Sequence, residues 1–264
     1  MYRAIILAGE RAESQQQNEL LKYANAEAKS LIKIKDRPMI VYILNALMQS
    51  NLIEHIYVIG NPLLLEKSSE LQELLRLNKI EFKPQKTSPV ESILSIFEEV
   101  EEVKDNSKIF ITTSDNVLIK KEWIDYFLKM ASESGKDILI GVNNYKNVKA
   151  KYPESKRTVL KLNDISLCFC NLFAIMNSNC KEVIVLWKKV ERVRKNPFKM
   201  AMMLMPLYGL ILFALGLLTS DNALNIMSKK LKINIGLIIM PFPEACIDVD
   251  KIEDLILVNK ILST

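Results

Sequence analysis

A carboxylate follows a run of β-branched and aromatic residues near the middle of the chain. The segment Lys108–Thr113 reads as a strand, and Ser114 and Asp115 come directly after it. In open α/β sheets, ligands lie beyond the carboxyl ends of the strands, where an aspartate can hold Mg²⁺ while the metal binds a triphosphate. Asp115 followed by Asn116 is also ordinary turn chemistry. These residues alone leave both interpretations open.

The N-terminal segment has the order expected of a loop that handles phosphate. An apolar, β-prone run ends in Leu7, Ala8 and Gly9. A polar loop with Arg11 follows, and Lys29 then precedes a second short apolar run. This order predicts a strand that leads into a phosphate-handling loop at the edge of an α/β sheet. Without other information, a solvated loop charge is the favoured interpretation of either cation.

Acidic residues gather again close to the C-terminus. Asp250 and Glu253 have the spacing of a capping box, so we expect Asp250 to cap a closing helix over residues 252–262. Asp248 alternates with Asp250 at the end of the preceding strand and has no such structural role.

Composition narrows the chemistry. The 264 residues, 49% of them hydrophobic, suffice for one large α/β domain or two small ones. The net charge of +5 suits a phosphate ligand or an anionic membrane surface, whereas the 7% aromatic content and the lack of Arg/Gly tracts disfavour nucleic acid. The single histidine, His55, makes a Ser/His/Asp triad or a His-based zinc site improbable. Carboxylates and lysines must therefore carry the chemistry.

The cysteines indicate a reducing compartment. Cys168, Cys170, Cys180 and Cys246 show no C-x-x-C spacing, and the first two alternate within one apolar run. We expect reduced, buried thiols that behave as small hydrophobic residues. The apolar run at the N-terminus is too short for a signal peptide, so we expect a cytoplasmic protein.

Strand and helix patterns alternate along the chain. The expected strands cover residues 4–7, 56–59, 108–113, 138–142 and 233–241, with a strand pair over 159–162 and 167–175. The expected helices cover residues 39–48, 62–77, 122–131, 221–230 and 252–262, with another that starts at Ser88. This alternation predicts an α/β fold, in which a mostly parallel sheet has helices on both faces.

A long apolar segment raises the question of a membrane. After a helical pattern over 181–195, residues 200–220 contain no charge, which is long enough to span a bilayer. Basic residues lie just before it, as they do before membrane anchors. However, Pro206, Gly209 and Gly216 interrupt the segment, so we expect a turn at Pro206 between two shorter, buried helices. Peripheral membrane contact through 200–220 is possible but not favoured.

Together these segments resemble one enzyme family. Leu7-Ala8-Gly9-Glu10-Arg11, the pair Lys29 and Leu31, and Arg37-Pro38-Met39 resemble the N-terminal signature of MobA-like nucleotidyltransferases, which belong to the GT-A-type NTP transferase superfamily. A bacterial subset with "LAGER" and a long loop is the most similar. The resemblance implies a Rossmann-like GT-A fold: a mostly parallel, mixed sheet sandwiched by helices. It further implies a single domain over 1–264 with a helical insertion at about 180–230.

The resemblance also assigns roles to particular residues. It implies that Asp115 and Asp248 hold Mg²⁺, and that Arg11, Lys29 and Asp115 are catalytic. It places a nucleoside triphosphate against Leu7, Ala8, Gly9, Lys29 and Ser114. Asn171, which follows the basic patch Lys156-Arg157-Thr158, would contact the acceptor.

The function implied is Mg²⁺-dependent transfer of a nucleoside monophosphate from an NTP to a small phosphorylated acceptor, either a cofactor precursor or a phospho-sugar, with release of pyrophosphate. One departure from the family pattern supports a rival. Gly9 is a lone glycine in its loop, and Glu10 and Glu13 bring negative charge to where phosphate should lie. The alternative is therefore a catalytically degenerate nucleotide-binding or scaffold protein of the same fold, with residues 200–220 as a membrane contact. The oligomeric state stays open.

Overall fold

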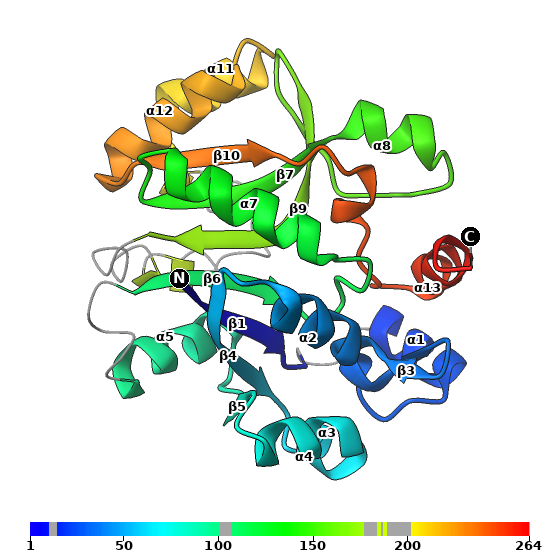
Figure 1. Ribbon diagram of the computed structural model, residues 1–264. Coiled ribbons are helices and arrows are strands. Elements are labelled where there is room, and N and C mark those ends of the chain that lie inside the picture. Colours follow the sequence, from blue (N-terminus) through cyan, green and yellow to red (C-terminus); the bar gives the residue numbers. More distant parts are fainter. Residues whose placement is uncertain (11–14, 101–106, 177–183, 186, 189–201, 264) are drawn as a thin grey trace.

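An eight-stranded mixed sheet forms the centre of the molecule (Figure 1). The computed structural model describes residues 1–10, 15–100, 107–176, 184–185, 187–188 and 202–263. The strands of the sheet are β1 (Tyr2–Ala8), β4 (Ile53–Gly60), β5 (Glu81–Pro84), β6 (Lys108–Thr113), β7 (Ile138–Asn144), β8 (Leu160–Lys161), β9 (Ser166–Ile175) and β10 (Ile235–Ile239). Their order is β10-β7-β9-β6-β1-β4-β5, and β8 pairs with β9. All pairs are parallel except those of β9, which runs antiparallel to β6, β7 and β8. The predicted mostly parallel sheet is confirmed.

Helices cover both faces of this sheet. The helices of the described residues are α1 (Gln15–Ala24), α2 (Met39–Gln49), α3 (Leu63–Lys67), α4 (Ser69–Arg76), α5 (Pro89–Glu99), α7 (Lys121–Glu133), α8 (Tyr145–Lys151), α11 (Leu207–Ala214), α12 (Ser220–Leu231) and α13 (Ile252–Ile261), with the 3-10 turns η1 (Lys29–Leu31) and η3 (Pro243–Cys246). A two-residue hairpin joins β2 (Lys33–Ile34) to β3 (Arg37–Pro38). Alternation along β1 divides the core, because Ala4 and Ile6 pack with α2 and α7, whereas Ile5 packs with α5. The fold is thus a three-layer α/β sandwich.

Local capping chemistry explains where two helices begin. The Ser88 hydroxyl accepts a hydrogen bond from the Glu91 N–H at 3.2 Å, and Pro89 opens α5, as predicted. The single helix predicted over 62–77 is wrong. Ser68 is extended there and its hydroxyl accepts from the Leu71 N–H at 3.3 Å, so the chain breaks into α3 and α4.

The apolar segment is less buried than predicted. As expected, Pro206 precedes a helix, α11. Within the described residues, however, α11 is not a buried helix. It lies beyond the edge strand β10, beside α12 (Figure 1). Much of its apolar surface is exposed, and the largest exposed apolar side chains of this region are Leu207, Tyr208, Ile211, Phe213, Leu215 and Leu217.

No helix in the part of the chain that the structure describes combines the length and apolar character needed to cross a bilayer. Residues 177–183, 186 and 189–201 lie outside that part, and with them most of the helix predicted over 181–195. The single domain and its insertion at 180–230 therefore stay predictions.

Candidate functional site

Two parallel strands bring their carboxyl ends together at one edge of the sheet. β1 and β6 are neighbours, and the Ser114 N–H donates to the Leu7 carbonyl at 3.0 Å just past the end of β6. The Ser30 hydroxyl of η1 lies 2.7 Å from the Ser114 hydroxyl and donates to the Ala8 carbonyl at 3.2 Å. These contacts fix η1 against both strand ends. Lys29, the first residue of η1, is therefore held beside Asp115.

The Lys29 ammonium bridges two carboxylates. Its Nζ lies 2.6 Å from Oδ2 of Asp115 and 2.6 Å from Oδ1 of Asp250. Burial lowers the pKa of Lys29, but the two carboxylates outweigh that effect and raise it. Burial alone would raise the pKa of Asp115, yet Lys29 and the hydrogen bond from Thr113 hold it below its ordinary value. Both groups are therefore ionised at neutral pH.

Asp250 does not have the role predicted for it. The first residue before α13 is Lys251, and its side chain makes no capping hydrogen bond. Instead of capping the helix, Asp250 points its carboxylate to Lys29, while its backbone N–H donates to Oδ2 of Asp254 at 3.2 Å. The capping-box prediction is wrong because the Asp250 carboxylate pairs with Lys29 across the site instead of accepting a hydrogen bond from the start of α13.

Asp248 is held by a buried arginine. The Arg157 guanidinium, whose side chain is 6% exposed, pairs with Asp248 and with Asp254 at the start of α13. The Asn171 amide donates to Oδ2 of Asp248 at 2.9 Å. Asn171 has a φ of 53°, a left-handed conformation that asparagine tolerates better than most residues.

The two carboxylates named as metal ligands lie close enough to interact electrostatically. The Val249 N–H donates to the Asp115 carbonyl at 3.2 Å, which joins the segment after Asp248 to the end of β6. Burial, then the charges of Asp115 and Asp250, raises the pKa of Asp248 to about 6, despite Arg157 and Lys29. Asp248 is thus a carboxylate whose charge is repelled by its acidic neighbours and stabilised by any added cation.

The Gly9 loop is packed by a side chain that the sequence did not reveal. The Gln85 Oε1 accepts from the Glu10 N–H at 2.8 Å, and a Cβ on Gly9 would lie only 2.7 Å from the same oxygen. Glycine at this position therefore permits the close approach of Gln85. The Glu10 carboxylate accepts from the Lys29 backbone N–H at 2.9 Å.

The structure brings together most of the site residues that were predicted. Lys29, Asp115, Asp248 and Asn171 converge through the contacts above, and Leu7, Ala8, Gly9 and Ser114 surround the two strand ends. Arg11 lies outside the described residues. The sequence reasoning did not assign roles to Ser30, Gln85 or Asp254, and it named Arg157 only as part of a basic patch. Their partners lie far away in the chain, so no local pattern marked them.

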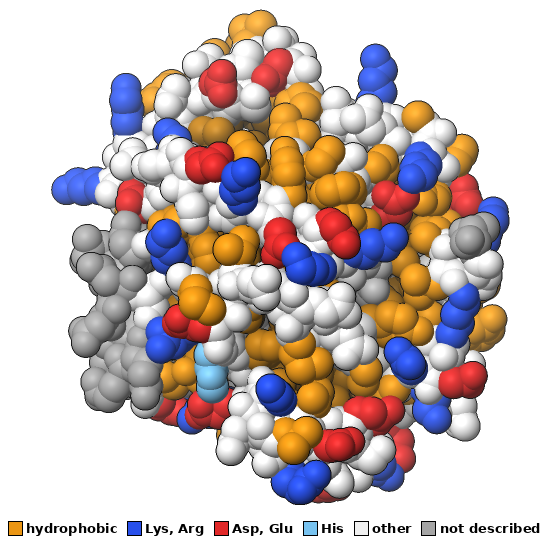
Figure 2. Space-filling view, in the orientation of Figure 1, with side chains coloured by type: hydrophobic (Ala, Val, Ile, Leu, Met, Phe, Trp, Pro, Cys, Tyr) orange, Lys and Arg blue, Asp and Glu red, His pale blue; other side chains and the backbone are white. Residues whose placement is uncertain are grey.

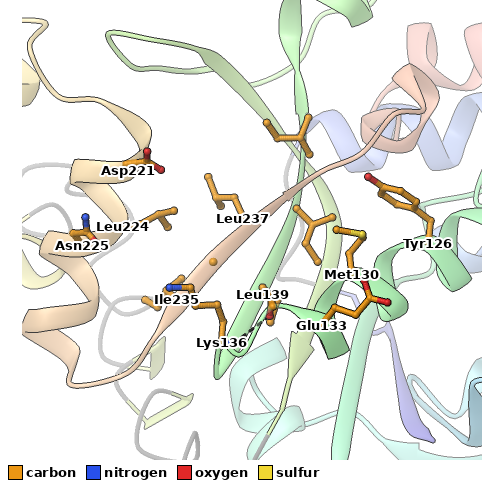
Figure 3. A pocket seen from close by; sticks show the side chains of 14 residues that line it. Tyr126, Met130, Glu133, Lys136, Leu139, Asp221, Leu224, Asn225, Ile235 and Leu237 are labelled. Carbon is orange, nitrogen blue, oxygen red and sulfur yellow. Dashed lines mark hydrogen bonds between the residues drawn. The ribbon is translucent and has the colours of Figure 1, made fainter.

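Two hollows in the described surface differ in chemistry. The smaller, about 350 Å³, is lined by Asp248, Asn171 and Arg157, and also by Lys156 and Lys251. The larger, about 770 Å³, lies between α7, β10 and α12, where Figure 3 shows Met130 and Tyr126 on one side and Leu224 on the other. Figure 2 shows hydrophobic side chains gathered over β10 and α7. The larger hollow contains none of the candidate site residues, so the smaller one adjoins the chemistry.

Comparison with known structures supports the fold. A hypothetical transferase from Thermus thermophilus is 22% identical with a TM-score of 0.76, over 96% of this chain and 99% of that one. A CMP:2-keto-3-deoxy-manno-octonic acid synthetase complexed with CTP is 12% identical with a TM-score of 0.57, over 100% and 99%. The 4-diphosphocytidyl-2C-methyl-D-erythritol synthase of Anaerococcus prevotii is 9% identical with a TM-score of 0.57, over 100% and 96%. At these identities the likeness concerns the fold.

Comparison with sequence families identifies the class. No curated protein gives a significant match to the sequence. The family model for the MobA-like NTP transferase domain, in contrast, matches residues 4–194 of the 264, and this span carries most of β1 together with Lys29, Asp115 and Asn171. The protein therefore belongs to the family of MobA-like NTP transferase domains and is a nucleotidyltransferase enzyme.

Proposed function

We propose that the enzyme moves a nucleoside monophosphate from an NTP to a small phosphorylated acceptor and releases pyrophosphate, with Mg²⁺ as its cofactor. The observation that carries this proposal is the convergence of Asp115, Asp248 and Lys29 at the carboxyl ends of the strands. The names of two similar structures mention CTP or a cytidyl product, which makes CTP the first donor to test. A cofactor precursor and a phospho-sugar are the acceptor classes that we consider.

The donor set suits a metal that shares its ligands with a nucleotide. Within the described residues, no three His, Cys, Asp or Glu side chains form a metal cluster on their own. Mg²⁺ is commonly held by one or two carboxylates together with substrate phosphates, and the raised pKa of Asp248 marks a place where a cation is favourable. We propose Asp115 and Asp248 as the residues that hold it. When bound, Mg²⁺ would neutralise negative charge on the triphosphate.

The chain's own groups would position the reactants and stabilise charge. In such a transfer an acceptor phosphate oxygen attacks the α-phosphorus, the bond to the β-phosphate oxygen breaks, and pyrophosphate leaves. An ionised phosphate is already a nucleophile, so a site without histidine is adequate. Lys29 would exchange a carboxylate contact for a triphosphate oxygen and stabilise the charge that develops there. Asn171 and the smaller hollow, which Lys156 and Lys251 also line, would receive the acceptor.

One feature favours a second candidate, nucleotide binding without turnover. The Glu10 carboxylate accepts from the Lys29 backbone N–H, so this N–H does not point to an open phosphate site. A protein of this kind would bind Mg²⁺ and nucleotide but release no pyrophosphate. For either candidate function we propose that the protein is located in the cytoplasm, because nucleoside triphosphates are available there.

A thermal-shift panel tests the proposal. CTP, GTP, ATP and UTP are each added with and without Mg²⁺ to the wild type and to Asp115→Asn. A ligand that binds the folded state raises the melting temperature, so we expect a Mg²⁺-dependent shift for one nucleotide that Asp115→Asn removes. The variant itself should fold normally, since Lys29 keeps Asp250 as its partner. The matched control is Asp221→Asn, which removes a carboxylate from the larger hollow.

Pyrophosphate release then separates the two candidate functions. Turnover with a phosphorylated acceptor supports the transferase, whereas nucleotide binding with no release across cofactor precursors and phospho-sugars supports the binding protein. If Asp221→Asn removes the nucleotide shift and Asp115→Asn leaves it, the site has been placed in the wrong hollow.

A further inference from the structure

Two thiols from distant segments lie in contact beside the proposed metal site. Cys168 lies in β9 and Cys246 ends η3, and their sulfur atoms are 3.1 Å apart. Both thiols are free and buried. A disulfide bond is about 2.0 Å long, so an approach of about 1 Å would join them. Both line the smaller hollow that we propose for the acceptor, but neither has a chemical role in the transfer proposed above.

The surroundings make Cys168 the more reactive thiol. The hydrogen bond with Cys246 lowers the pKa of Cys168, and the nearby Arg157 charge lowers it further, although burial opposes both. Burial raises the pKa of Cys170 well above its ordinary value. Because the thiolate is the nucleophile in thiol chemistry, Cys168 is the residue prepared to react.

A small oxidant can reach this pair from the smaller hollow. Cys168 and Cys246 both line that space of about 350 Å³, together with Arg157 and Asp248. Cys170 is not among its lining residues. The hollow is polar in part, which suits a small hydroperoxide better than a bulky apolar reagent.

We propose that Cys168 and Cys246 are a reversible oxidation site, at which a small hydroperoxide forms a disulfide that slows nucleotidyl transfer. The first half of this proposal concerns the thiols alone. The second half rests on the proposed function, because it concerns the position of Asp248.

The chemistry balances with the peroxide as oxidant. The Cys168 thiolate attacks one peroxide oxygen, the O–O bond breaks, and hydroxide leaves and takes up a proton as water. The Cys246 sulfur then attacks the sulfur of the Cys168 sulfenic acid, the S–O bond breaks, and a second water leaves. Two thiols lose two electrons and two protons in total, and one hydrogen peroxide becomes two waters. A dithiol reductant reverses the change.

The disulfide would act on the site through a short segment. Cys246 is followed by Ile247 and then Asp248, so a shift of the Cys246 sulfur is transmitted to the proposed metal ligand. A displacement of about 1 Å in a positioned catalytic group can reduce turnover ~100-fold. We therefore expect turnover of the oxidised enzyme to fall at least tenfold and to recover on reduction.

The test uses the full chain with Cys180→Ser, since Cys180 lies outside the described residues. After treatment with hydrogen peroxide and removal of the excess, intact mass and alkylation of the remaining thiols count the oxidised cysteines. Peptide mapping without reductant then identifies the linked pair. We expect the loss of two hydrogens and a Cys168–Cys246 link that dithiothreitol removes.

Matched variants separate this pair from other thiol chemistry. Cys168→Ala and Cys246→Ala should abolish the link, whereas Cys170→Ala should keep it; Cys168→Ser and Cys246→Ser repeat the test if an alanine variant is unstable. A link through Cys170, or no link at millimolar peroxide, overturns the oxidation site. A link that leaves turnover unchanged overturns the regulatory half. If the reduced enzyme neither binds nor turns over nucleotide, the proposed function fails while the oxidation site is still decided by mass.

Discussion

The pH dependence of nucleotide binding tests the electrostatics of the site most directly. The pKa of Asp248 is raised to about 6, whereas that of Asp115 is lowered, so one of the two proposed metal ligands titrates in an accessible range. With a pKa of about 6, Asp248 is about 90% ionised at pH 7 and about 9% ionised at pH 5, since each pH unit changes the ratio of the two forms tenfold. Binding that needs the ionised form is lost as the pH falls.

The size of the loss follows from these fractions. If Mg²⁺–nucleotide binds only to ionised Asp248, its apparent dissociation constant rises ~10-fold from pH 7 to pH 5, or ~1.4 kcal/mol. Titration of a fluorescent nucleotide at fixed, saturating Mg²⁺ measures this constant across the range. Carboxyl ¹³C NMR of the free protein with labelled aspartate records the titration of Asp248 itself.

A variant separates the protein's titration from that of the nucleotide. Asp250 raises the pKa of Asp248, so Asp250→Asn should move the loss of binding to lower pH. The phosphates of the nucleotide titrate identically with both proteins and cannot cause such a difference. The reasoning is refuted if affinity is constant from pH 5 to pH 7, or if the wild type and Asp250→Asn lose binding at the same pH.

Two further substitutions test the cations of the site. Lys29→Ala should weaken triphosphate binding ~10-fold or more, because it removes the cation beside Asp115, whereas Mn²⁺ binding, measured by paramagnetic relaxation, should change little. The control is Lys33→Ala, which removes an exposed lysine nearby. If Lys29→Ala weakens triphosphate binding no more than Lys33→Ala does, Lys29 is only a surface charge. Arg157→Met removes the buried partner of Asp248 and Asp254, so the free energy of unfolding should fall by ~3–5 kcal/mol in urea titrations at pH 7, and Arg157→Lys should lose less. An Arg157→Met protein as stable as the wild type would show that these carboxylates do not need the guanidinium.

The sequence predicted those features that depend on short-range patterns. The β-branched runs that became β1 and β6 are continuous and apolar, as expected for strands buried on both faces. The position of Asp115 directly after one of these strands was enough to predict that it lies at the edge of the sheet where ligands bind, whereas the pairing of β1 with β6 came from the structure. The Ser88 cap was predicted because its partners lie within three residues.

The features that were missed depend on partners far away in the chain. Asp250 and Glu253 matched a capping box, but Lys29 lies 221 positions from Asp250 and pairs with it in the fold. Arg157 is 91 positions from Asp248 and 97 from Asp254. A local sequence pattern cannot indicate contacts between residues that are so far apart in the chain. The break at Ser68 was missed for another reason: the helical pattern of the sequence continues through this residue.

The bridge made by Lys29 has a consequence for how the enzyme is synthesised. Closing the Lys29–Asp250 contact rather than the Lys29–Asp115 contact, which spans 86 positions, costs only ~0.8 kcal/mol more in chain entropy. Long-range closure is nevertheless slow to reach during folding. On the ribosome, β1 and β6 can pair well before Asp248 and Asp250 emerge from the exit tunnel, so a nascent chain can complete most of its sheet while it still lacks half of its site. The proposed nucleotide site can then be completed only after the segment that carries Asp248 and Asp250 has emerged and packed against Lys29.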